Sequence, residues 1–223
     1  MSPPVSAPSA PAGPDRDCGG CPRLVAFREE WRAVEPGWHN APVQSFGGLD
    51  ARLLIVGLAP GLRGANRSGR PFTGDHAGDL LYATLGDCGF AAGTYGARPE
   101  DGLALRDCRI TNAVRCVPPK NKPTAAEIAA CRDFLAAEIA AMSRLRAILA
   151  LGQVAHGAVL RALGRRAGAC RFAHGAVHRL DAARLLVDSY HCSRLNTNTG
   201  RLTPAMFADV FRTIREALDA PPA

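Results

Sequence analysis

Four short segments of the chain are continuously apolar, and each is about the length of a buried strand. They lie at residues 52–57, 109–114, 146–151 and 184–187. Continuous apolar runs, unlike alternating apolar and polar residues, are typical of strands covered on both faces, as in a parallel sheet. The pattern therefore predicts four strands of one buried parallel sheet.

Helical patterns lie between these runs, so strand and helix alternate along the chain. Helices are predicted at 23–34, at 153–163 and directly after Asp75. Thr124 and Glu127 form a capping box, in which side chains satisfy the free backbone N–H groups at a helix start. The helix behind that box has apolar residues at helical spacing, namely Ile128, Cys131, Leu135, Ile139 and Met142.

The last helix is predicted to begin at Thr203, with Pro204 in its first turn. Its apolar stripe consists of Met206, Val210, Ile214 and Leu218. Helices that alternate with parallel strands pack on both faces of the sheet through right-handed connections. The predicted fold is therefore a three-layer α/β/α domain with a central four-stranded parallel sheet.

The composition is that of a folded protein. The chain has 223 residues, of which 47% are hydrophobic, enough for one domain with a sizeable core, and we expect it at 15–220. Residues 1–14 are rich in Pro, Ala and Ser without periodicity, which is typical of a disordered tail. No apolar run approaches the roughly 18 residues of a membrane span, and no secretory signal is recognisable, so a cytoplasmic protein is expected. No additional interface element is recognisable in the sequence, so a monomer is expected.

The net charge is +7, because 27 Lys and Arg residues outnumber 20 Asp and Glu residues. A basic protein attracts polyanions, since Lys and Arg displace counterions from phosphates. The charge therefore permits a nucleic-acid partner, although an excess of arginine can also reflect a GC-rich genome.

Polar residues gather where the predicted strands end. These positions are 57–61, 112–116, Gly152 and 190–196. In open α/β sheets, ligands bind beyond the carboxyl ends of the strands. The sequence therefore predicts an active-site crevice at this edge of the sheet.

The loop after the first predicted strand reads GLAPG at 57–61 and continues to NRSGRPFTGD at 66–75. Glycines let the backbone approach a ligand closely, and helix starts bind anions. A plain strand-to-helix loop would also be glycine-rich. An aromatic, a carboxylate and three basic residues in one loop favour a functional site: Phe72, Asp75, Arg63, Arg67 and Arg70.

Two further polar positions carry candidate chemistry. Asn112 interrupts an apolar strand, and its carboxamide offers a donor beside an acceptor, which matches the edge of a pyrimidine. His191 stands in a polar loop at 189–201, which suits a catalytic imidazole beside a nucleic-acid backbone. The structural alternatives are an Asn bonded to a neighbouring loop and a histidine satisfied within its own loop.

Eight cysteines are present, and disulfides are not expected in a reducing cytosol. Cys18 and Cys21 form a C-x-x-C pair, and Cys116 and Cys131 stand 15 residues apart (131 − 116). Four thiolates from three segments could hold zinc or an iron–sulfur cluster. Buried, unreactive thiols are the better reading for Cys88, Cys108 and Cys170.

Together these segments resemble the uracil-DNA glycosylase superfamily and, within it, the iron–sulfur type-5 branch. The resemblance covers about residues 18–218 and rests on GLAPG, NRSGRPFTGD, TNAVRCVPPKNKPT and YHCSRLNTNTGRLT. It implies a four-stranded parallel sheet between helices. It also implies an enzyme that flips uracil out of DNA and hydrolyses its N-glycosidic bond, leaving an abasic site.

The resemblance implies roles for individual residues. Those implied for catalysis are Asp75 and His191. Those implied to contact the flipped base are Gly57, Ala59, Phe72, Asn112 and His191. Those expected to contact DNA are Arg63, Arg67, Ser193, Arg194, Leu195 and Arg201. The implied ligands of a structural [4Fe-4S] cluster are Cys18, Cys21, Cys116 and Cys131.

The sequence departs from the family pattern at three positions. Ala59 stands where related branches have an acid or amide, so the GLAPG loop offers only backbone groups, and excision of hypoxanthine or xanthine is expected beside uracil. Cys192 replaces a Pro or aliphatic residue. Leu195 replaces a polar residue, which makes it a candidate wedge for the gap left by the flipped base.

Two other classes of protein fit parts of the sequence. A non-catalytic nucleic-acid-binding protein with a structural metal would need the basic loops and cysteines, but not Asp75 beside Phe72. An electron-transfer protein would use the cluster, but no flavin or nicotinamide fingerprint accompanies it. No lysine is placed to form a Schiff base, which favours a monofunctional glycosylase.

Overall fold

The computed structural model describes residues 13–166 and 168–220. At its centre is a five-stranded sheet in the order β4, β1, β5, β7, β6. The strands are β1 (Leu53–Gly57), β4 (Cys108–Asn112), β5 (Ala147–Leu151), β6 (Val177–Arg179) and β7 (Leu185–Ser189). Strand β1 pairs in parallel with β4 and β5, and β5 pairs in parallel with β7. Strand β6 runs antiparallel to β7 at one edge.

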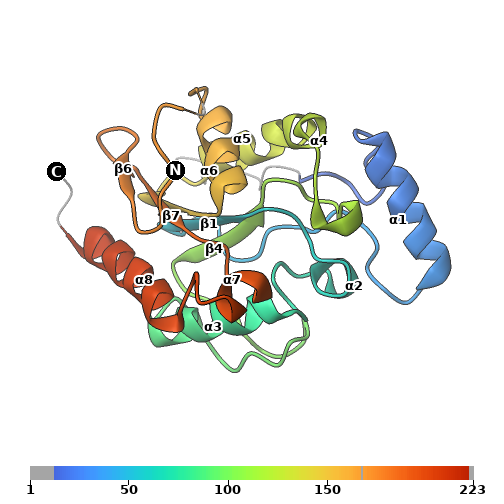
Figure 1. Ribbon diagram of the computed structural model, residues 1–223, viewed down its shortest axis with the longest axis horizontal. Coiled ribbons are helices and arrows are strands. Elements are labelled where there is room, and N and C mark those ends of the chain that lie inside the picture. Colours follow the sequence, from blue (N-terminus) through green and yellow to red (C-terminus); the bar gives the residue numbers. More distant parts are fainter. Residues whose placement is uncertain (1–12, 167, 221–223) are drawn as a thin grey trace, which may run out of the picture.

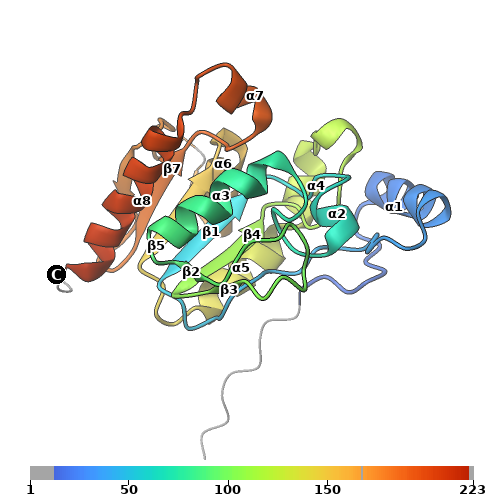
Figure 2. The same ribbon diagram turned by 90° about the horizontal axis from the view of Figure 1, so that it is seen from below.

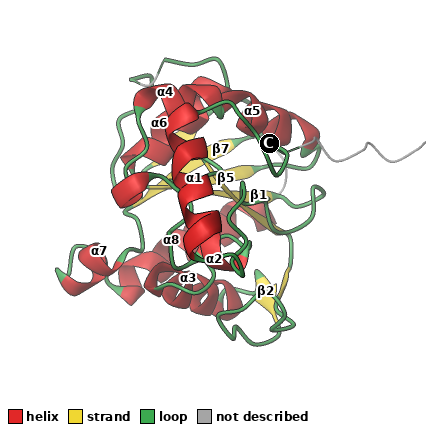
Figure 3. Ribbon diagram, turned by 90° about the vertical axis from the view of Figure 1, so that its right-hand side faces the viewer, coloured by secondary structure: helices red, strands yellow, loops and turns green. Residues whose placement is uncertain are grey.

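Helices cover both faces of the sheet, which gives three layers (Figures 1 and 3). One face is covered by α3 (His76–Asp87) and α8 (Pro204–Asp219), which lie in front of the strands in Figure 2. The opposite face is covered by α5 (Arg132–Ala141) and α6 (Gln153–Ala162). This arrangement confirms the predicted α/β/α layers.

Alternate residues of β1 serve the two cores. Leu53 and Ile55 belong to the core beneath α3 and α8, whereas Leu54 and Val56 belong to the core beneath α5 and α6. All four are 0% exposed. Burial on both faces explains why this strand is continuously apolar in the sequence.

The remaining elements are shorter or lie at the periphery. The helices among them are α1 (Pro22–Val34), α2 (Ala65–Ser68), α4 (Ala125–Ala130), α7 (Arg194–Asn198) and the 3-10 turn η1 (Pro119–Asn121). A small antiparallel pair consists of β2 (Ala91–Ala92) and β3 (Ala104–Leu105). Within 13–166 and 168–220, no helix is both long enough and apolar enough to cross a membrane.

Two elements differ from the predicted pattern. Strand β6 is absent from the prediction because it has only three residues and both of its ends are exposed. The single helix expected behind Thr124 is two helices, α4 and α5, which meet at Cys131. Cys131 packs beside Cys116, whereas Leu135 and Ile139 pack into the sheet core, so the two halves of this segment serve different sites.

The tail expected at 1–14 falls mostly outside the described residues, which begin at residue 13. Pro14 is buried, and its carbonyl accepts a hydrogen bond from Gln44 Nε2 at 2.8 Å. This contact joins the start of the described chain to the segment that precedes β1.

Candidate active site

A cavity of about 740 Å³ lies at the carboxyl edge of the sheet. Every parallel strand contributes to its wall: Leu58 follows β1, Asn112 ends β4, Leu151 ends β5 and His191 follows β7. Phe72 and Asp75 line it from the loop before α3. The structure therefore brings together residues that are 119 positions apart (191 − 72) in the sequence.

Asn112 lies opposite Gly57 in the β1–β4 ladder. A Cβ atom on Gly57 would stand 2.3 Å from Asn112 Oδ1 and 2.6 Å from Phe72 Cζ, so any larger residue would displace both side chains. The lack of a side chain at Gly57 thus leaves room for the side chains of Asn112 and Phe72, whereas Ala59 itself lines the cavity. Asn112 is 3% exposed, and its Oδ1 has no hydrogen-bond partner among the described residues. An unpaired buried polar atom costs about 1–3 kcal/mol, which a bound ligand can recover.

Phe72 lies beside His191, with 5.9 Å between ring centroids and 28° between ring planes. Its φ of 52° lies in the left-handed region, which is strained for a non-glycine residue. Two hydroxyls hold this backbone: Tyr95 donates to the Phe72 carbonyl at 3.2 Å, and Tyr82 donates to the Pro71 carbonyl at 2.6 Å. The aromatic ring is therefore fixed in place before any ligand enters.

Arg70 comes from the same loop but is turned into the protein. Its guanidinium donates to both carboxylate oxygens of Asp101, at 2.8 and 2.6 Å, and to Thr73 Oγ1 at 2.7 Å. The two side chains of the ion pair are 6% and 2% exposed. The hydrogen bonds from Arg70 hold the pKa of Asp101 far below its usual value. This buried pair fixes the loop that carries Phe72, and Arg70 does not line the cavity.

Asp75 is the N-cap residue of α3, where its Oδ1 accepts a hydrogen bond from the Gly78 N–H at 3.2 Å. Its Oδ2 faces Gly61 and Gly64, where Cβ atoms would stand 2.8 and 2.3 Å away. Burial raises the pKa of Asp75, and the N–H groups at the helix start oppose that rise. The result is a poorly hydrated carboxylate held at the cavity wall.

His191 is a neutral imidazole at physiological pH, because burial lowers its pKa to about 4. Its Nδ1 is buried without a hydrogen-bond partner in the described chain. Asn196 Nδ2 donates to the His191 carbonyl at 2.8 Å and anchors the loop. A neutral imidazole has one N–H donor and one acceptor nitrogen, so His191 can offer a hydrogen bond without bringing a charge into the cavity.

The basic and polar residues expected to contact DNA separate into two groups. Those that line the cavity are Arg63, Ser193, Arg194 and Leu195. Leu195 is 72% exposed, which is unusual for a leucine. Arg67 and Arg201 are exposed outside the cavity, and the Arg201 guanidinium lies 4.4 Å from the Tyr190 ring centroid.

Several lining residues were not expected from the sequence. Gln153 and Val154 begin α6, and Asn121 reaches the cavity from the loop after β4. Gln153 directly follows Gly152, a predicted strand end, and that adjacency was the available signal. His76 also lines the cavity, and its Nε2 lies 2.9 Å from Thr197 Oγ1, which joins the Asp75 loop to α7.

The four predicted ligand cysteines come together beside the cavity. Cys116 and Cys131 are buried, Cys18 and Cys21 are half-buried, and all four thiols are free. Burial raises the pKa of Cys116 to about 12, and the other three cysteines are near enough to raise it further. Ala59 packs against the cluster that contains Cys116 and Cys131. The cysteine centre therefore adjoins the GLAPG loop that forms one wall of the cavity.

Arg28 provides a test of what these cysteines can hold. It is 3% exposed, and its Nη1 donates to the Cys18 carbonyl at 3.1 Å. Its Nε makes no hydrogen bond among the described residues and lies 3.7 Å from Glu29 Oε1. Its positive charge lowers the pKa of Cys116, against the larger effect of burial. A buried cation with a free N–H beside four thiols fits an anionic metal–thiolate centre. Of the three cysteines expected to be buried thiols, Cys108 is buried, whereas Cys88 and Cys170 are half-buried.

An aromatic ring, a carboxamide, a carboxylate and an imidazole thus line one cavity at the carboxyl edge of the sheet. The sequence model of the Uracil DNA glycosylase superfamily matches residues 44–215, and this chain belongs to that superfamily.

Within the superfamily, the chain is similar to proteins named type-5 uracil-DNA glycosylase. The one from Thermus thermophilus is 47% identical over 199 residues, covering 86% of this chain and 90% of the relative. The one from Mycobacterium leprae is 47% identical over 208 residues, covering 89% and 90%. A type-4 enzyme from Pyrobaculum aerophilum is 36% identical over 153 residues, covering 68% and 64%. The resemblance to the type-5 branch is confirmed.

Proposed function

We propose that this chain excises uracil from DNA by hydrolysing the N-glycosidic bond. The observation that carries the proposal is the convergence of Phe72, Asp75, Asn112 and His191 on one cavity of about 740 Å³. A base inside a duplex has to be flipped out of the stack to reach such a cavity. The similarity to proteins named uracil-DNA glycosylase supports the same reaction here.

The cavity wall supplies the contacts that a flipped uracil needs. The Phe72 ring offers a stacking face, and its strained backbone is held in advance, so little ordering remains for the bound state. Asn112 supplies a carboxamide for the donor and acceptor along the uracil edge. His191 donates to a base carbonyl as a neutral imidazole, and the backbone at Ala59 completes the wall.

Cleavage of the N-glycosidic bond gives the base and the sugar opposite charges. The bond between C1′ of the sugar and the base nitrogen breaks, which leaves negative charge on the base and positive charge on the sugar. His191 and backbone N–H groups of the GLAPG loop stabilise the base anion. Asp75 stabilises the sugar cation or orients the attacking water. Water supplies a hydroxyl to C1′ and a proton to the base, so the products are free uracil and an abasic site.

The enzyme is proposed to be monofunctional. A glycosylase that also cuts the strand forms a Schiff base through an amine. No lysine of the described residues lines the cavity. The reaction therefore ends at the abasic site.

DNA is proposed to lie across the cavity mouth. Arg63 and Arg194 at the rim bind flanking phosphates, and Ser193 donates to the backbone because its hydroxyl does not cap α7. Arg67 and Arg201 extend the same positive surface beyond the cavity. Leu195 fills the gap left in the duplex by the flipped base. A single domain at 15–220 carries all these contacts, so a monomer is sufficient.

The substrate range is proposed to extend to other deaminated bases. Ala59 contributes no polar side chain to the cavity wall, so no side chain at this position of the GLAPG loop can discriminate between bases by hydrogen bonding. Discrimination then rests mainly on Asn112 and His191. Hypoxanthine and xanthine carry carbonyl groups that the same donors can contact.

We also propose that Cys18, Cys21, Cys116 and Cys131 hold a [4Fe-4S] cluster. The donor set of four thiols and the buried Arg28 guanidinium beside them support this assignment. The cluster is structural: it ties the start of α1 and the chain around Cys131 to the wall of the cavity through Ala59.

Replacing Asp75 with Asn tests the catalytic assignment. Asn caps helices as well as Asp does, so α3 keeps its start while the cavity loses its carboxylate. We expect uracil release from a duplex to slow by about 10²-fold or more. The matched control is Asp79→Asn, which removes an exposed acid from the first turn of α3 and is expected to leave the rate unchanged.

The outcomes separate the competing functions. Full activity in Asp75→Asn would remove Asp75 from the mechanism. Tight binding of uracil-containing DNA by the natural chain with no base release would instead favour a non-catalytic DNA-binding protein. Release of uracil but not of hypoxanthine or xanthine would limit the substrate range to uracil.

The metal content tests the cluster. Protein purified without oxygen is expected to be brown, with about four iron and four sulfide ions per chain. Cys116→Ser is expected to lose this iron, whereas Cys88→Ser, at a half-buried site on the far end of α3, keeps it. Zinc in place of iron, with no visible absorbance, would contradict the assignment.

A further inference from the structure

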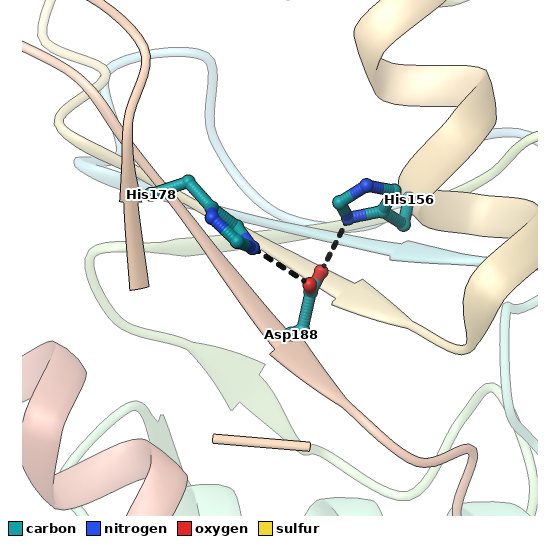
Figure 4. Close-up of side chains that lie close together, drawn as sticks. All are labelled: His156, His178 and Asp188. Carbon is teal, nitrogen blue, oxygen red and sulfur yellow. Dashed lines mark hydrogen bonds and ion pairs between the residues drawn. The ribbon is translucent and has the colours of Figure 1, made fainter. Parts of the chain in front are cut away.

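Three metal-ligating side chains from three elements meet outside the cavity. Figure 4 shows His156 from α6, His178 from β6 and Asp188 from β7 pointing toward one another. One ligand atom of each lies within 4.8 Å of those of the other two. His156 and Asp188 are 2% and 0% exposed, and His178 is half-buried. Base excision as described above makes no use of this group.

The hydrogen bonds around His156 leave a place for a proton or a metal ion beside Asp188. Its Nε2 lies 3.1 Å from the Cys170 carbonyl oxygen, which only accepts, so Nε2 carries a proton. Its Nδ1 lies 2.8 Å from Asp188 Oδ1, and a carboxylate oxygen also only accepts. A neutral imidazole has one N–H, so either a second proton or a metal ion has to stand between Nδ1 and the carboxylate.

We propose that His156, His178 and Asp188 form a zinc site. Two imidazole nitrogens and one carboxylate oxygen are a donor set that zinc accepts, with a fourth position left for water. The hydrogen bond from His156 Nε2 to the Cys170 carbonyl orients the ring, as outer contacts do for metal-bound histidines. Donor atoms on one zinc ion lie at most roughly 4 Å apart, so side-chain shifts below about 1 Å complete the site.

Access and local charge also suit a divalent ion. A pocket of about 820 Å³ is lined by both His156 and Cys170, so solvent approaches His156 from the α6 side. His178 Nε2 lies 3.1 Å from Asp188 Oδ2, so both carboxylate oxygens already face imidazoles. The ion would balance the buried charge of Asp188, which is otherwise costly in an apolar interior.

The site would act on the fold. It would join the short edge strand β6 and strand β7 to α6, whose first residue, Gln153, lines the active cavity. Asp188 stands three residues before His191 (191 − 188), so the same link steadies the loop that carries the imidazole. This role is separate from the four cysteines and does not depend on the glycosylase reaction.

The test is a zinc titration of the natural chain with its iron content measured beforehand. We expect one zinc ion per chain bound in addition to the iron, and a rise in the melting temperature. Cobalt as a probe distinguishes the two kinds of site, because thiolate ligands give intense near-ultraviolet charge-transfer bands and a His₂Asp site gives only weak visible bands. Zinc affinity is expected to fall by more than about 100-fold in His178→Gln. The control, His39→Gln, removes a histidine of another segment and keeps the site.

Two results would overturn the proposal. The first is a natural chain that binds no zinc beyond that taken up by its cysteines, which would show that a proton alone stands between His156 and Asp188. The second is a folded His178→Gln chain with undiminished zinc affinity. The first result needs no variant, so the proposal stays testable even if His178→Gln does not fold.

Discussion

Gly57 and Asn112 face each other across the β1–β4 ladder so closely that a Cβ atom on Gly57 would stand 2.3 Å from Asn112 Oδ1. The same atom would stand 2.6 Å from Phe72 Cζ. Since both neighbours line the cavity, one methyl group at this glycine would disturb two proposed base contacts at once. Strands β1 and β4 are both buried here, so neither can shift easily to relieve these close contacts.

Gly57→Ala is therefore expected to impair the enzyme. Overpacking here costs about 1–3 kcal/mol of unfolding free energy, and we expect uracil release to slow by at least about tenfold. The control is Gly86→Ala in α3, where a Cβ atom would meet nothing within 4 Å and helix propensity should improve. Urea unfolding and steady-state base release measure the two effects. An active, stable Gly57→Ala enzyme would show that Asn112 and Phe72 need not hold these positions.

The buried Arg70–Asp101 pair leads to a prediction about stability and activity together. Asp101→Asn leaves the Arg70 guanidinium without its charge partner at a site that is 6% exposed. We expect a loss of about 3–5 kcal/mol of unfolding free energy, because an unpaired buried charge is costly. Base release should also slow, since the loop that holds Phe72 loosens.

The matched control for Asp101→Asn is Asp181→Asn. Asp181 pairs with Arg184 at 2.7 Å, but its side chain is 37% exposed, and exposed pairs contribute at most about 1 kcal/mol. Chemical denaturation of both variants provides the comparison. Equal, small losses in the two variants would show that Arg70 does not stabilise the loop.

Much of this architecture follows from the sequence alone. Strands buried on both faces leave continuous apolar runs, so the four parallel strands were predictable. Because parallel strands end at one edge, the convergence of Asn112 and His191 was predictable as well. The roles of these residues remain predictions that kinetics must test.

Other features depend on contacts that a single sequence does not reveal. Strand β6 has three residues and exposed ends, so its pairing with β7 leaves no periodic pattern. Arg70 was counted among the basic residues that favour a functional loop, because its buried partner, Asp101, comes 31 residues later from another loop (101 − 70). The same limit hid the His156–Asp188 contact, whose residues come from a helix and a strand 32 positions apart.

The low pKa of His191 gives a pH dependence with a definite sign. Burial lowers this pKa to about 4, below the ordinary histidine value near 6.5. Between those values the unfolded chain binds more protons than the folded chain, so stability falls as pH falls through the window and levels off below about pH 4. From pH 7.5 to pH 5 the contribution of His191 is about 2 kcal/mol.

His191→Asn should lack this contribution. The natural chain and the variant are compared by urea unfolding at pH 7.5 and pH 5, and the difference between their two pH effects isolates His191. In the folded natural chain, the NMR signal of the His191 ring should not titrate between pH 5 and pH 8. Identical pH dependence in both chains would mean that the imidazole is better solvated than its surroundings indicate.

Leu195 is the residue whose exposure is hardest to explain without DNA. It lies at the cavity rim on α7 and is 72% exposed, although an apolar side chain gains nothing from water. A wedge that enters the gap left by a flipped base needs an exposed apolar side chain. Such a gap forms only in duplex DNA, where the flipped base leaves its paired and stacked neighbours behind. Leu195→Ala should therefore lower kcat/KM on duplex uracil DNA by about tenfold and leave kcat/KM on single-stranded DNA nearly unchanged. The unfolding free energy should change by less than about 0.5 kcal/mol, because the side chain is exposed. Val34→Ala removes a similarly exposed side chain, 61% exposed on α1, and should change neither rate. Because the wedge acts only where strands are paired, equal losses of kcat/KM on the two substrates would assign Leu195 to general DNA binding instead.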